Sequence, residues 1–156
     1  MPTAAEYAAD YRKGAAALRD AVAGMSREHL TARPIPGKWS TLEVVAHLAD
    51  FEPIIADRIK RLIATENPTL LAADEDLFAA HLHYQERDLD EELAVVDAMR
   101  ASTARLIAGL TPEQLAKTGT HSKKGLMTLE KVVQLAVFHI NHHLPFIMDK
   151  KRALQG

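Results

Sequence analysis

Residues 128–146 read TLEKVVQLAVFHINHHLPF, and this stretch contains the pattern that decides both the fold and the chemistry. Apolar residues such as Val132 and Ala136 recur every three to four positions along it, which predicts an amphipathic helix. His139 and His143 fall on the same stripe, four residues apart, so their rings lie one above the other. The helix therefore presents two imidazoles to the side that should face the core.

The same helical period recurs in three other segments: residues 4–25, 41–65 and 88–110. Two of these helices have clear start signals. Ser40 followed by Glu43 forms a capping box, and Asp88 is placed to cap the third helix. Four helices of about 20 residues predict an all-α fold, a single-domain antiparallel four-helix bundle over residues 1–156.

The segments between the helices are less regular. Residues 66–87 lack a period and predict a long connection with a short helix near residues 75–83, and a connection of that length often covers a site. Thr111 begins a further short helical turn, and residues 119–125 predict a polar loop. Almost nothing in the sequence predicts a strand.

The composition excludes several classes of protein. The 156 residues contain no cysteine, which rules out disulfides, thiolate metal sites and cysteine nucleophiles. Nineteen basic and 21 acidic residues give a net charge of -2, so we expect no nucleic-acid partner. No signal peptide and no apolar run long enough to span a membrane is visible, and we expect a cytoplasmic protein without a membrane partner. Eight histidines are the one unusual feature.

A third histidine joins the pair on the last helix. His47 lies on the apolar stripe of the second helix, where leucine, valine or alanine would satisfy packing. Burying imidazoles without partners is costly, so His47, His139 and His143 call for a shared partner, and a divalent metal ion is one. The intervening residues do not form the HExxH motif, which excludes a zinc protease of that type. The alternative is that each ring is a core histidine with its own hydrogen bond.

Other polar residues interrupt the stripes near these histidines. Asp50 follows His47 by one turn and is placed to orient a ligand ring or to bind the metal. Arg100 either clamps an anionic group of a substrate or pairs with Asp50 or Glu52. Tyr11 is either a core aromatic or a phenol near the metal, and Arg58 either lines the mouth of the pocket or is an exposed charge.

Two stretches of the sequence resemble the DinB/YfiT-like family. Residues 37–50, GKWSTLEVVAHLAD, are similar to its second-helix signature, and residues 139–147, HINHHLPFI, are similar to its closing motif. The resemblance implies a four-helix bundle in which His47, His139 and His143 hold a divalent ion such as nickel, zinc or iron. It also implies a homodimer, and it implies small-molecule substrates, because characterised relatives are thiol-dependent transferases and isomerases that use bacillithiol or mycothiol.

Two functions remain open from the sequence. The first is a metal-dependent enzyme, either a hydrolase or a thiol-dependent S-transferase or isomerase acting with a low-molecular-weight thiol. The second is a non-catalytic bundle, a ligand-binding or dimerising stress protein that its metal only stabilises. Because metal binding needs neutral imidazoles, the sequence further predicts that metal affinity falls below pH ~6.5.

Overall fold

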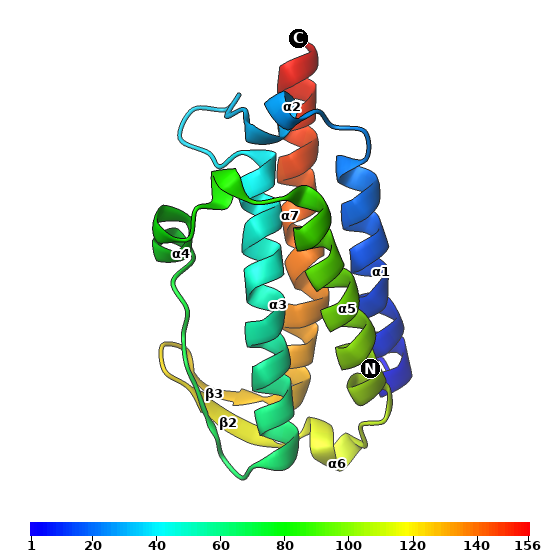
Figure 1. Cartoon of the computed structure of the whole chain (residues 1–156). Coiled ribbons are helices and arrows are strands. Elements are labelled where there is room, and N and C mark those ends of the chain that lie inside the picture. Colours follow the sequence, from blue (N-terminus) through cyan, green and yellow to red (C-terminus); the bar gives the residue numbers. More distant parts are fainter.

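Four long helices form the body of the molecule, as the sequence predicts (Figure 1). The computed structural model describes residues 1–156. The long helices have these bounds: α1, Ala4–Val22; α3, Thr41–Ala64; α5, Leu89–Ala108; α7, Leu129–Gln155. Each predicted start or end of these helices is within three residues of the observed one. The all-α four-helix bundle is confirmed.

Polar side chains start each of these helices. The hydroxyls of Thr3, Ser40 and Thr128 and the carboxylate of Asp88 each accept a hydrogen bond from a backbone N–H in the first turn. At Ser40 the carboxylate of Glu43 also accepts from the Ser40 backbone, completing the predicted capping box. These caps fix where the two histidine-bearing helices, α3 and α7, begin.

The order of the helices differs from a simple antiparallel bundle. Helices α1 and α3 each pack against both α5 and α7. In Figure 1, α1 and α7 run upward and α3 and α5 run downward, so the neighbours α3 and α5 are parallel, and so are the neighbours α1 and α7. The prediction of an antiparallel arrangement was wrong for these two pairs. The reason is the long connection after α3, which carries the chain back along the bundle before α5 starts.

Short elements occupy the connections: α2, Arg27–Thr31; β1, Thr69–Leu70; α4, Glu75–His81; the 3₁₀ turn η1, Tyr84–Glu86; α6, Pro112–Leu115; β2, Thr118–His121; β3, Gly125–Thr128. The helices α4 and α6 are confirmed where the sequence predicts them. The predicted polar loop at residues 119–125 was wrong, because β2 and β3 form an antiparallel hairpin there. Strand β1 pairs with β2 in parallel, so the order in the sheet is β1-β2-β3.

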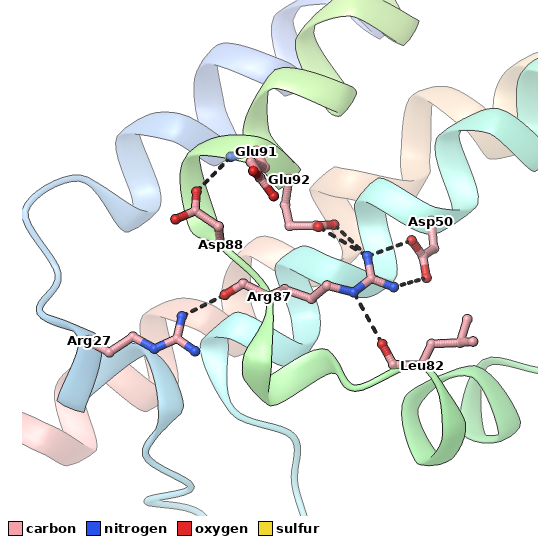
Figure 2. A network of polar contacts seen from close by, with 7 residues as sticks. All are labelled: Arg27, Asp50, Leu82, Arg87, Asp88, Glu91 and Glu92. Atoms are coloured by element: carbon pink, nitrogen blue, oxygen red, sulfur yellow. Dashed lines mark hydrogen bonds and ion pairs between the residues drawn. The ribbon is translucent and has the colours of Figure 1, made fainter.

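The connection between α3 and α5 is fixed at both ends. At its start, β1 is hydrogen-bonded into the sheet. At its end, the guanidinium of Arg87 donates to the carboxylates of Asp50 on α3 and Glu92 on α5 and to the carbonyl of Leu82 (Figure 2). Arg27 in turn donates to the Arg87 carbonyl. Between these anchors, α4 has no buried residue.

The core consists of two apolar clusters, one in each half of the bundle. Two fully buried charged residues, Glu52 and Arg100, lie beside Tyr11 of the first cluster. No helix is apolar enough over a sufficient length to cross a membrane. The interior of the bundle therefore has a polar layer at mid-height, next to the turn of α7 that bears His139.

Candidate metal centre

Three imidazoles from two helices converge at one point. One ring nitrogen from each of His47, His139 and His143 lies within 4.8 Å of the other two. The Nε2 atoms of His47 and His139 are 3.0 Å apart. The structure thus brings together the three histidines that the sequence singles out.

The helices hold these rings at fixed positions. His139 and His143 are one turn apart on α7, and their ring centroids lie 5.2 Å apart. His47 projects from α3, is 4% exposed, and has Trp39 and Phe51 as aromatic neighbours at 5.3 and 4.5 Å between ring centroids. Aromatic packing on both sides limits the motion of the His47 ring.

The hydrogen bonding of the rings is incomplete. The Nδ1 atoms of His47 and His139 are buried and have no hydrogen-bond partner. Buried polar atoms are nearly always paired, so two unpaired atoms in one cluster need an explanation. The alternative that each ring is a satisfied core histidine is therefore wrong for this pair.

Burial keeps all three rings neutral. Loss of solvent lowers the pKa of His47 and of His143 to about 4, and the same effect, strengthened by the neighbouring rings, lowers the pKa of His139 to about 3. Neutral imidazole is the form that binds metal ions. The three rings are thus able to act as ligands at any pH near neutrality. Metal affinity should therefore begin to fall at a lower pH than the ~6.5 expected from the sequence.

The geometry fits a divalent ion. Two ligands at 2.0–2.1 Å from one ion lie about 3.0–3.4 Å apart, which matches the separation of the two Nε2 atoms. The three histidines also line a cavity of about 590 Å³, so an ion bound to them has room for a water or a substrate atom. Three protein ligands with an open position are typical of a catalytic metal site.

The predicted neighbours of the site have other roles. Asp50 does not reach a ligand ring, because both of its carboxylate oxygens accept hydrogen bonds from Arg87 (Figure 2). Arg100 does not reach a substrate, because it is fully buried and its Nε donates to Glu52 at 2.6 Å. Tyr11 donates to Glu52 as well, at 2.6 Å, and does not face the histidines. The alternative of an Arg100–Glu52 pair is confirmed.

The cluster of Tyr11, Glu52 and Arg100, here called the buried ion-pair cluster, joins all four long helices. Arg100 on α5 donates to the Tyr11 carbonyl on α1, to Glu52 on α3 and to the Ala136 carbonyl on α7. Its guanidinium also lies 4.2 Å from the centre of the Tyr11 ring. A Cβ at Gly14 would collide with this guanidinium, so the glycine makes room for it. The cluster fixes α3 and α7 relative to each other.

Sequence reasoning missed several residues of the cavity, and His121 is one of them. His121 on β2 lines the same cavity as the three histidines, although the sequence places it in a loop. The signal that could have identified it is weak, because strands of four residues are too short to show an alternating pattern.

The sequence profile of the DinB superfamily matches residues 10–147. The chain belongs to the DinB superfamily. The match includes all three histidines of the candidate metal centre and confirms the DinB/YfiT-like resemblance.

This DinB protein is similar to several curated proteins. It is 27% identical to a protein of Oceanobacillus iheyensis over 130 residues, 83% of this chain and 75% of the relative. It is 28% identical to YfiT of Bacillus subtilis over 140 residues, 89% of this chain and 79% of YfiT. Both relatives are provisionally named as metal-dependent hydrolases.

The solved structure of Bacillus subtilis YfiT has the same fold. It superposes with a TM-score of 0.89 at 26% identity, over 96% of this chain and 86% of the YfiT chain. That structure is described as a four-helix bundle of unusual topology.

Proposed function

We propose that this DinB protein is a metal-dependent hydrolase of small molecules, with a divalent ion held by His47, His139 and His143. The observation that carries the proposal is the convergence of three neutral imidazoles at the wall of a cavity, with the Nε2 atoms of His47 and His139 3.0 Å apart. The provisional names of the relatives support the same class of reaction.

Each part of the site has a role in this proposal. When bound, a divalent ion with an open position supplies a Lewis acid that lowers the pKa of a water or a thiol. The three imidazoles hold it without adding negative charge. Phe51 packs against His47 and against Phe78 of α4, at 5.6 Å between the two phenyl centroids, and so helps to shield the rings from bulk water. Glu75 lines the cavity close enough to His143 to influence its pKa, and is placed to accept a proton.

The same donor set suits activation of a low-molecular-weight thiol, which would make the protein an S-transferase or isomerase. The chain has no cysteine, so the thiol would have to come from a substrate. Zinc, nickel and iron all accept imidazole ligands, and the assays below therefore use each of them.

The metal site is tested by replacing His143 with alanine in protein purified without a histidine tag. We expect the natural chain to bind one equivalent of zinc, nickel or ferrous ion and H143A to lose at least about tenfold in affinity. The matched control is H142A, since His142 is the exposed neighbour on the same turn and lies outside the three-histidine cluster. Equal metal affinity in the natural chain and H143A would overturn the assignment.

Catalysis is tested with the metal-loaded protein and a panel of ester, amide and phosphoester substrates, followed by electrophiles with added thiol. We expect turnover that H143A abolishes while its circular dichroism spectrum stays helical. If H143A loses only thermal stability and no metal-loaded sample turns over any substrate, the ion is structural and the non-catalytic alternative replaces this proposal.

A further inference from the structure

The cavity has a second polar region, away from the three histidines. Basic side chains line its wall where α3 meets the β2–β3 hairpin: Arg58, His121, Lys123 and Lys124. None of these residues belongs to the three-histidine cluster. We call them the basic end of the cavity.

Arg58 is the central residue of this end. One of its terminal nitrogens, Nη2, donates to the Leu71 carbonyl at 2.6 Å, which fixes the direction of the side chain. Its Nε is buried and has no hydrogen-bond partner, and the guanidinium forms no ion pair. The neighbouring carboxylate of Asp57 pairs instead with Arg61 at 2.7 Å. Arg58 therefore brings to the cavity wall a positive charge that no carboxylate pairs with.

His121 adds a second donor. Its Nδ1 accepts hydrogen bonds from the backbone N–H groups of Lys123 and Lys124, each at 3.2 Å. An imidazole nitrogen that accepts carries no proton, so in the neutral ring the proton is on Nε2, which then acts as a donor. The side chain is 7% exposed and lines the cavity. The positive charges of Arg58 and the two lysines lower its pKa further than burial alone, which shows that they lie near it.

The balancing negative charge at this end is small. Lys124 forms no ion pair, and Lys123 has only a 4.0 Å approach to Asp74. The carboxylates that line the cavity, Glu75 and Asp76, come from α4, and Glu75 acts on His143 at the other end. Arg58 and Lys124 therefore keep positive charges that no carboxylate of the chain pairs with.

We propose that the basic end binds an anionic group of the substrate, a carboxylate or a phosphate, through Arg58 and His121. This inference rests on the proposed function for the identity of the reacting end, because the three histidines lie in the same cavity. An arginine donor and an imidazole N–H suit an oxyanion, and charge-assisted hydrogen bonds of this kind are strong when partly buried. The three histidines line another part of the same cavity, so a substrate bound in this way has its charged end toward the hairpin.

The experiment measures binding of succinate and of inorganic phosphate to the full chain by calorimetry at low ionic strength. It is done with zinc-loaded and with chelator-treated protein, because the metal-free sample reports the basic end without anions binding to the metal. We expect saturable binding in both samples, and at least about tenfold weaker binding by R58Q. The two anions distinguish a carboxylate site from a phosphate site.

The matched control is R61Q, which removes an arginine one turn along α3 that is exposed and paired with Asp57. We expect R61Q to bind like the natural chain, and K124A to weaken binding by about two- to threefold because Lys124 is exposed to screening solvent. Circular dichroism checks that R58Q is folded, and R58K, which keeps the charge, should bind more tightly than R58Q.

Two outcomes would overturn the inference: no saturable binding of either anion, or equal binding by the natural chain, R58Q and K124A. A different set of results would overturn the proposed function and leave this inference standing. In that case zinc does not bind or H143A keeps it, while the metal-free protein still binds the anion through Arg58.

Discussion

The bundle contains two buried polar clusters with opposite hydrogen-bonding states. In the buried ion-pair cluster every nitrogen of the Arg100 guanidinium has an acceptor, and both oxygens of Glu52 have a donor. In the three-histidine cluster two ring nitrogens have no partner within the chain. The clusters are neighbours, since the Ala136 carbonyl that accepts from Arg100 lies one turn before His139.

This difference separates a structural role from a binding role. A saturated polar cluster offers nothing to a ligand and contributes by fixing the helices that it joins. In the three-histidine cluster the Nε2 atoms of His47 and His139 contact only each other, so an ion could take the place of this contact and would stabilise the folded chain to which it binds. The residues of both clusters are largely buried, so burial does not distinguish the clusters. The number of hydrogen-bond partners within the chain does.

The largest expected effect comes from breaking the saturated cluster. Glu52→Ala leaves Arg100 buried without its carboxylate, and we expect a loss of about 3–5 kcal/mol in the free energy of unfolding. Urea denaturation measures it. Arg19→Ala is the control, because it removes an exposed ion pair with Asp97 and should cost no more than about 1 kcal/mol. Similar losses for the two variants would contradict the assigned role.

A smaller effect is expected when the open cluster is titrated in metal-free protein. The folded-state pKa of His47 is about 4 and its unfolded value is ~6.5, so the unfolded chain binds more protons between these values. Stability therefore falls as the pH drops through this window, by up to about 3 kcal/mol for His47.

Denaturation of chelator-treated protein at pH 7, 6, 5 and 4 measures this dependence, with a His47→Gln variant to subtract the contribution of the carboxylates. The natural chain should lose more stability than the variant. Metal affinity should likewise persist below pH 6.5 and fall as pH approaches the lowered pKa values. Parallel curves for the two proteins would show that His47 is not held neutral by burial.

The smallest expected effect is that of a single ligand ring in the metal-free protein. His139→Leu removes a buried Nδ1 that has no partner, but it also removes the 3.0 Å contact of the His47 Nε2, so the free energy of unfolding should change by less than about 1 kcal/mol. Added zinc should stabilise the natural chain and leave the variant unchanged. A large loss of stability in the metal-free variant would mean that the histidine cluster, like the ion-pair cluster, holds the fold together.

Residues with a helical period were predictable from the sequence, and residues outside such a period were not. The caps at Ser40 and Asp88 and the three histidines on apolar stripes follow from helix geometry, which fixes the direction of every side chain. Asp50 was assigned to the site because it follows His47 by one turn, but Arg87 binds it. Arg87 comes from a connection without a period, and no pattern on α3 indicates that it will be there.

The hairpin was missed for a related reason. Each of its strands has four residues, and β2 contains Gly119, which packs closely against the Pro68 carbonyl and the Leu62 side chain. Such strands are stabilised by contacts with distant parts of the chain rather than by their own propensity. His121, and with it the basic end of the cavity, could therefore be found only in the structure.

The absence of buried residues in α4 has an evolutionary consequence. This seven-residue segment borders the cavity through Glu75 and Asp76, yet the two apolar clusters of the core do not include it. Substitutions at its exposed positions should therefore alter which molecules enter the cavity with little effect on the stability of the core. Related proteins with different substrates are therefore expected to differ in α4 more than in the four long helices.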